Sequence, residues 1–150
     1  MLYQLLACGL VSLFNFGLHA IVTGIVVVAT RHTAAATDDL HVFARVTALM
    51  MVTMVALLLA HLAEISVWAA YYAWHGIETA KATPLELAFE NYTALGYGDI
   101  VPQADKRIVG PATALNGLLL IGWSVAIIFE VMKMADVHLA RKEPADGRHG

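Results

Sequence analysis

Two ionisable side chains that could carry chemistry, those of His61 and Glu64, lie inside one long run of apolar residues. Together with Trp68 they follow a spacing of three and then four residues, which places them on one face of a helix. An ionised carboxylate is costly away from water, so Glu64 needs a partner. His19 or Asn15, which are four residues apart in an earlier apolar run, could supply it, as could a residue of a neighbouring subunit.

This polar face has more than one interpretation. It could form a proton-sensitive contact between helices, or a hydrogen bond between helices that only fixes their packing, which is the commoner role of such residues. Histidine is also a ligand of haem and transition metals, so His19 and His61 permit an electron carrier in which two helices hold a cofactor. The remaining histidines fall outside the apolar runs, and there is no CxxCH motif.

Hydrolytic chemistry finds no support in the sequence. Ser12, Ser66 and Ser124 lie in apolar stretches, and no nucleophile, base and acid gather in a polar segment. We therefore expect a protein that is not an enzyme. The formal charge of −3 combines both signs without a basic stripe, so nucleic acid is not an expected partner. The single cysteine, Cys8, cannot form an internal disulfide.

The composition places the chain in a lipid bilayer. Of its 150 residues 59% are hydrophobic and 14% are charged, which leaves too little polar surface to coat a soluble globule. A helix of about 20 apolar residues crosses a hydrocarbon core of ~30 Å. Three apolar stretches therefore predict transmembrane helices, at about 2–30, 46–74 and 108–132. The second ends in aromatic residues that suit an interfacial belt, namely Trp68, Tyr71, Tyr72 and Trp74.

The segment 75–107, between the second and third spans, contains a short helix followed by glycines. Thr83 and Glu86 have the spacing of a capping box, which predicts a helix over about 84–92. Such a helix is too short to cross a bilayer. Unsatisfied peptide groups in lipid cost several kcal/mol each, so the insert is predicted to be re-entrant, with its glycine segment facing a wet axis.

The short helix is followed by a motif that reads Tyr92-Thr93-Ala94-Leu95-Gly96-Tyr97-Gly98-Asp99-Ile100-Val101-Pro102. This motif resembles the signature of the potassium-channel pore-loop family, whose usual filter reads TVGYGD. The resemblance covers about 84–132. It implies an all-α membrane protein with three transmembrane helices and a re-entrant pore helix and filter between the second and third. It further implies a small prokaryotic ion channel that assembles as a homotetramer and conducts potassium passively.

By this resemblance, residues 94–99 form the selectivity filter. Glycines at 96 and 98 let successive carbonyls line one wall, while the side chains between them turn away into surrounding protein. One chain supplies one wall, so the ring needs three further identical subunits. Apart from K⁺ as the permeant ion, no cofactor is expected. The filter positions are Ala94, Leu95, Gly96, Tyr97 and Gly98, and the carbonyls of the first four would hold K⁺.

Ala94 stands where the family has a threonine whose hydroxyl helps to form the innermost ion site. The hydroxyl of Thr93 is one residue early and should point behind the filter. We therefore expect a potassium-selective filter whose innermost site is weakened. A weakly selective monovalent cation channel is the alternative. Alternatives of another class are a non-conducting membrane subunit and the haem or metal electron carrier.

Two carboxylates are predicted to support the filter. Glu90 occupies a position where some members of the family place a pore-helix carboxylate, which bonds to the aspartate that closes the filter, here Asp99. Two carboxylates brought together out of bulk water cannot both ionise cheaply, so one should hold a proton. The alternative is that Glu90 faces a wet crevice.

The third span carries a candidate gating hinge. Gly117 matches the hinge region of the family's inner helix, and Gly122 is a competing candidate. Glycine bends a helix cheaply. The alternative is that Gly117 and Ala114 are small because the span packs closely against the pore helix.

Lysine and arginine predict the orientation. Six of the nine, at 31–45 and after residue 132, lie on one side if the C-terminus is cytoplasmic. The N-terminus is then outside, and residues 133–150 form a short cytoplasmic tail. Together with the resemblance, this predicts a multi-pass protein of the cell inner membrane, surrounded by the lipid bilayer.

Overall fold

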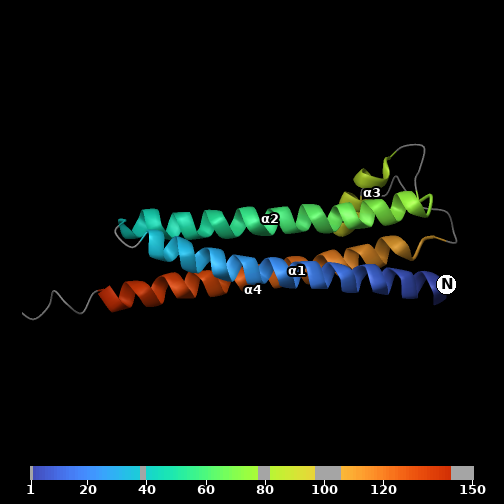
Figure 1. Ribbon diagram of the computed structural model, residues 1–150. Coiled ribbons are helices and arrows are strands. Elements are labelled where there is room, and N and C mark those ends of the chain that lie inside the picture. Colours follow the sequence, from blue (N-terminus) through green and yellow to red (C-terminus); the bar gives the residue numbers. More distant parts are fainter. Residues whose placement is uncertain (1, 38–39, 78–81, 97–105, 143–150) are drawn as a thin grey trace, which may run out of the picture.

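The computed structural model describes residues 2–37, 40–77, 82–96 and 106–142, with side chains up to Ala135. Within these residues four helices follow one another, three long and one short (Figure 1). They are α1 (Leu2–Ala36), α2 (Val42–Trp74), α3 (Pro84–Tyr92) and α4 (Val109–Lys142). The prediction of an all-helical chain with three helices long and apolar enough to cross a membrane is confirmed.

Each long helix continues past the apolar stretch that predicts it. α1 ends at Ala36 instead of near residue 30, and α2 begins at Val42 instead of near 46. α4 continues to Lys142, so residues 133–142 are helical and extend α4 beyond the predicted span, whereas a cytoplasmic tail over 133–150 stays a prediction. The predicted bounds of the spans lie where charged residues begin. A charged residue ends an apolar stretch but does not end a helix, because Ala, Lys, Arg and Leu are strong helix formers and water solvates the charged side chains beyond the lipid.

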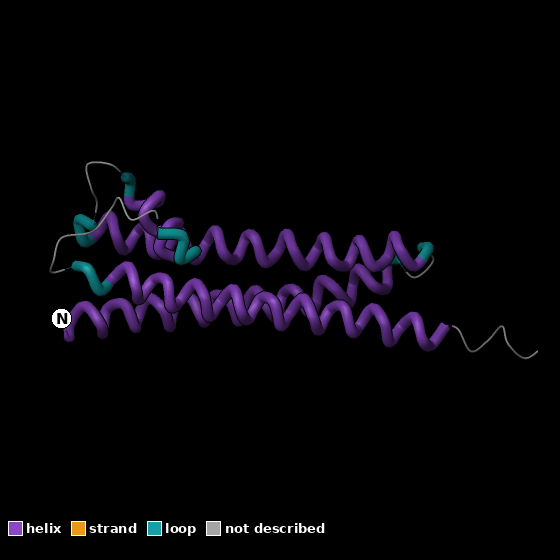
Figure 2. The backbone as a smooth tube through the Cα atoms, turned by 180° about the vertical axis from the view of Figure 1, so that it is seen from behind, coloured by secondary structure: helices purple, strands orange, loops and turns teal. Residues whose placement is uncertain are grey.

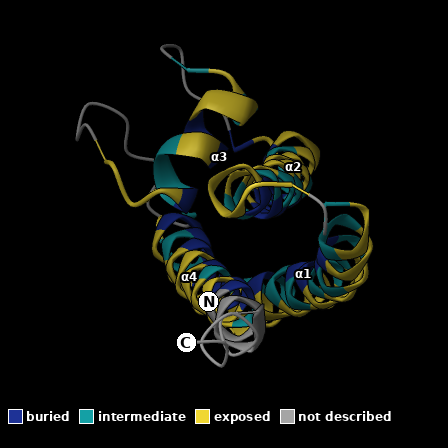
Figure 3. Cartoon of the chain, turned by 90° about the vertical axis from the view of Figure 1, so that its left-hand side faces the viewer, coloured by how far each residue is buried: buried dark blue, intermediate teal, exposed yellow. Residues whose placement is uncertain are grey.

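The long helices lie side by side, with α2 antiparallel to α1 and α4 (Figures 1 and 2). α3 lies at the end of the bundle where α1 begins, and it packs against α2 and α4. Seen along the bundle, α1 packs against α2 and α4 on the side away from α3 (Figure 3). The bundle therefore holds α3 from two sides, and α1 supports those two helices from behind.

The core consists of two apolar clusters separated by a polar layer. One cluster surrounds α3 and includes Trp68, Leu87 and Leu120. The other lies toward the opposite end of the bundle and includes Val26 and Ile127. Along α1, α2 and α4, the buried polar residues His19, Glu64 and Ser124 lie between the two clusters and form this layer. Glu64 can therefore find its partner within the layer.

The start of α3 is a capping box, as the sequence predicts. The Glu86 backbone N–H donates to the Thr83 hydroxyl at 3.3 Å, and the Glu86 carboxylate accepts from the Thr83 backbone N–H at 2.7 Å. Pro84 occupies the first turn, where its missing N–H costs nothing. The capping box therefore fixes the start of α3 at Pro84, and the helix continues to Tyr92.

Acidification should loosen this helix start. Hydrogen bonds from the backbone and then the hydroxyl of Thr83 favour the ionised carboxylate and lower the pKa of Glu86. A lowered pKa stabilises the folded start at neutral pH, and this contribution is lost as pH falls through the folded-state pKa. Amide-exchange protection of Leu87 and Ala88 should therefore fall on acidification. Glu86→Gln, which keeps a neutral capping group, should show protection that changes little with pH, and equal pH dependence in both proteins would contradict the prediction.

Candidate functional site

The end of α3 forms a tight corner that leads the chain into residues 94–99. The Leu95 N–H donates to the Glu90 carbonyl and the Ala94 N–H to the Asn91 carbonyl, each at 3.0 Å. Ala94 has a φ of 54°, so the helix ends in a Schellman motif whose left-handed position holds alanine instead of the usual glycine. This conformation costs roughly 1–2 kcal/mol for a residue with a Cβ. Sequence reasoning missed this feature of Ala94.

Thr93, Leu95 and Gly96 flank Ala94 at this corner. Gly96 has a φ of 47°, in keeping with the expectation that glycine is needed for its backbone conformation. Leu95 is 58% exposed. Its side chain is expected to turn into surrounding protein, but its own chain does not bury it. The hydroxyl of Thr93 donates to the Phe89 carbonyl at 2.8 Å, within its own helix.

The rest of the predicted filter, Tyr97, Gly98 and Asp99, lies outside the described residues. The pairing of Glu90 with Asp99 therefore stays a prediction, as does ion binding by the carbonyls of residues 94–97. Glu90 itself is partly buried.

Gly117 of α4 lies directly against the C-terminal end of α3. A Cβ built on Gly117 would lie 2.0 Å from the Tyr92 carbonyl oxygen and 2.8 Å from its carbonyl carbon. No side chain fits in that space. This close approach supports the packing interpretation of Gly117. The hinge interpretation stays a prediction.

Glu64 is the centre of a buried hydrogen-bond cluster that joins three helices. Its carboxylate lies 2.8 Å from His19 Nδ1 of α1 and 3.1 Å from His61 Nδ1 of α2. The Tyr92 hydroxyl of α3 donates to the same carboxylate. Ser124 of α4 adds a fourth helix, since its hydroxyl lies 2.9 Å from His61 Nε2. The predicted partner of Glu64 on α1 is thus His19, and its link to the end of α3 was not predicted.

Asn116 of α4 forms a second buried polar contact beside this cluster, and sequence reasoning did not single it out. Its side-chain oxygen accepts from Asn15 Nδ2 at 3.1 Å and from Trp68 Nε1 at 2.9 Å. The Asn15 amide also donates to the Glu64 carbonyl at 3.3 Å. The only available signal was an amide side chain in an apolar span, which needs a partner in lipid.

The predicted aromatic belt at the end of α2 is wrong for two of its members. Trp68 and Tyr72 are fully buried inside the chain, whereas Trp74 is 87% exposed. The Tyr72 hydroxyl lies 2.7 Å from Thr113 Oγ1 of α4 and accepts from Asn91 Nδ2 of α3 at 3.1 Å. Aromatic residues with a polar group suit an interface, but the same polar groups also serve to join helices.

One comparison with known proteins gives a match. A family model described as an ion channel matches residues 85–134, which contain nearly all of α3, the predicted filter and most of α4. Neither the curated proteins nor the solved structures contain a match. The matched third of the chain includes the corner at Ala94, the GYGD segment and Gly117. The match supports an ion channel.

Proposed function

We propose that four copies of this chain form a passive, potassium-selective channel. The observation that carries the proposal is the corner at the end of α3, where the backbone takes the left-handed conformation at Ala94 and again at Gly96, immediately before Tyr97, Gly98 and Asp99. A filter needs such departures from regular backbone so that successive carbonyls can replace the water around a dehydrated ion. The match to an ion-channel family over this segment agrees with it.

The uncovered face of α3 supports assembly into a tetramer. Leu85, Phe89 and Leu95 are 48%, 40% and 58% exposed, and together with Glu90 and Thr93 they line a depression of about 420 Å³. In lipid, where no transfer out of water drives apolar faces together, helices associate through packing contacts, and this depression offers such contacts to a neighbouring subunit. In the proposed tetramer, neighbouring subunits bury this face and the filter of each chain lines a common axis.

Potassium would be bound by the backbone carbonyls of Ala94, Leu95, Gly96 and Tyr97. A filter of carbonyls conducts ions down their electrochemical gradient, without chemistry on the ion. Because Ala94 supplies no hydroxyl, the innermost site has fewer oxygen ligands than the usual filter of this kind. We therefore propose weaker ion binding there than at the outer sites.

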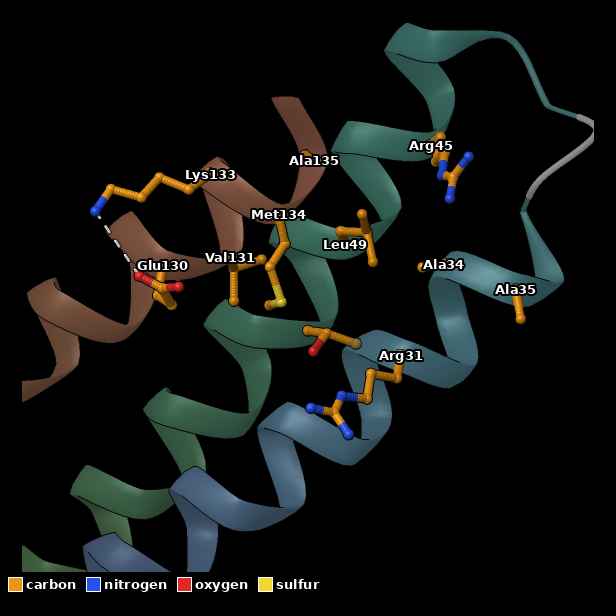
Figure 4. Close-up of a pocket in the computed structure, with 11 residues that line it drawn as sticks. Arg31, Ala34, Ala35, Arg45, Leu49, Glu130, Val131, Lys133, Met134 and Ala135 are labelled. Carbon is orange, nitrogen blue, oxygen red and sulfur yellow. Dashed lines mark ion pairs between the residues drawn. The ribbon is translucent and has the colours of Figure 1, made fainter. Parts of the chain in front are cut away.

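The basic end of the bundle supports a proposed orientation. A cavity of about 900 Å³ opens between α1, α2 and α4 at the end away from α3 (Figure 4). Arg31, Arg45 and Lys133 line it, the last 3.9 Å from Glu130. Basic residues favour the cytoplasmic side of a membrane. We propose that this end is cytoplasmic and that α3 and the N-terminus lie on the outer side of the cell inner membrane.

Ion flux through the reconstituted protein tests the proposal. In liposomes with potassium on one side and sodium on the other, the reversal potential should show a preference for potassium of about tenfold or more, equivalent to ~1.4 kcal/mol. Gly96→Ala places a Cβ at a φ of 47° and should lower this preference. The control Gly24→Ala, where nothing lies within 4 Å, should leave it unchanged.

The same measurement separates the alternatives. Equal permeability for the two ions would contradict potassium selectivity and favour a weakly selective cation channel. No flux from a correctly assembled tetramer would favour a non-conducting subunit.

A further inference from the structure

Three potential metal ligands converge in the cluster around Glu64. One ligand atom each from His19, His61 and Glu64 lies within 4.8 Å of the other two. His19 and Glu64 are fully buried, and the side chain of His61 is 19% exposed. Two imidazoles and a carboxylate are a ligand set of zinc sites. We propose that these residues bind a divalent metal ion of the zinc class, independently of the proposed filter.

The cluster is one hydrogen short if each of its contacts with Glu64 and Ser124 is a hydrogen bond. The contacts of the two Nδ1 atoms with Glu64, and of the two Nε2 atoms with Ser124, each need one hydrogen. The hydrogen of Tyr92 is already used in its own bond to Glu64. Two neutral imidazoles and one serine hydroxyl supply one hydrogen fewer than these contacts need while Glu64 is ionised. A buried carboxylate in a membrane also requires a compensating charge.

A metal ion on the two Nδ1 atoms removes this shortage. Both imidazoles then carry their hydrogen on Nε2, and both can donate to Ser124 Oγ, which lies 2.9 Å from His61 Nε2 and 3.4 Å from His19 Nε2. Metal-bound histidines usually donate their second ring N–H in this way, which fixes the ring. One added proton would also supply the missing hydrogen, so the convergence of three ligand atoms, and not the hydrogen count, is what favours a metal ion. Ser124 is therefore assigned as the residue that orients both ligands.

The distances suit a small ion. Tetrahedral zinc with ligand bonds of ~2.0–2.1 Å holds its ligand atoms roughly 3.3 Å apart. Glu64 Oε1 lies 2.8 Å from His19 Nδ1 and Glu64 Oε2 lies 3.1 Å from His61 Nδ1, and one ligand atom from each residue lies within 4.8 Å of the other two, so a modest rearrangement brings the three to zinc. The Tyr92 hydroxyl lies 2.8 Å from His61 Nδ1 and is placed to be a fourth ligand. Because both ring nitrogens of each histidine already face protein side chains, the site favours a small ion over a porphyrin.

Zinc binding by the purified protein, in the tetrameric state proposed above, tests the proposal. After incubation with Zn²⁺ and gel filtration, elemental analysis should find one zinc per chain. His19→Gln and His61→Gln should each lose most of this zinc, whereas His32→Gln, an exposed histidine on α1, should retain it. Ser124→Ala keeps all the ligands and should weaken zinc binding about tenfold or more. Loading with Co²⁺ should give the visible absorption of a four-coordinate site in the parent and not in His19→Gln.

The elution volume of the tetramer shows whether each variant has assembled, and ion flux does not enter the test. Zinc retained equally by the parent and by both ligand variants would overturn the proposal, since that binding would lie elsewhere. Absence of zinc from the parent, with a melting temperature that responds to pH but not to added Zn²⁺, would also overturn it, because a proton would then be the cation of the cluster.

Discussion

Gly117→Ala is expected to abolish potassium flux through the reconstituted protein and to lower the stability of the proposed tetramer. The added Cβ would lie 2.0 Å from the Tyr92 carbonyl oxygen, so α4 and the end of α3 must move apart. Overpacking of a tight contact usually costs about 1–3 kcal/mol, and a contact with backbone leaves little room for relief. Flux into liposomes and thermal unfolding of the tetramer measure the two effects.

Gly122→Ala is the matched control, five positions further along α4. Nothing lies within 4 Å of a Cβ at Gly122, and alanine favours helix over glycine by up to ~1 kcal/mol. This variant should keep flux and should be at least as stable as the parent. If Gly117→Ala lost flux at unchanged stability, the hinge hypothesis would gain over packing. If it kept both, the close contact would be irrelevant to function.

Glu64→Ala is expected to give the second large effect, a loss of about 3–5 kcal/mol in the free energy of unfolding. The change removes the acceptor that His19, His61 and Tyr92 share, and it leaves their polar groups buried without that partner. The contact of α1 with the end of α3 passes through this carboxylate, so flux should fall as well. Thermal unfolding with a chelator present measures the effect without any contribution from bound metal.

Glu130→Ala serves as the control for Glu64→Ala. Glu130 pairs with Lys133 at 3.9 Å on an exposed face of α4, where an ion pair contributes about 0–1 kcal/mol. Its removal should leave the melting temperature nearly unchanged. Similar melting temperatures for the two variants would show that the buried cluster does not stabilise the protein.

The spans and the start of α3 could be predicted because each depends on local sequence. Apolar length identified the three long helices, and Thr83 with Glu86 located the first turn of α3. The demand of Glu64 for a partner was also predictable, since it follows from the cost of burying a charge. In each case a rule about a few neighbouring residues was sufficient.

The features that were missed depend on contacts between helices. Neither Asn116 nor the burial of Trp68 can be derived from one helix, because the acceptor of Trp68 Nε1 lies on another. Ala94 was read as a missing hydroxyl, whereas its left-handed backbone depends on how α3 ends. The apolar stretch 108–132 does not show how far α4 continues, because apolarity marks where lipid stops and gives no information about where a helix stops.

The corner at the end of α3 also bears on the order of assembly. Its bonds, from Leu95 to Glu90 and from Ala94 to Asn91, connect residues of one chain, so a newly inserted protomer can close them before it meets another. If four chains assemble as proposed, each protomer then docks with this turn already formed, so the encounter does not carry the entropy cost of ordering it.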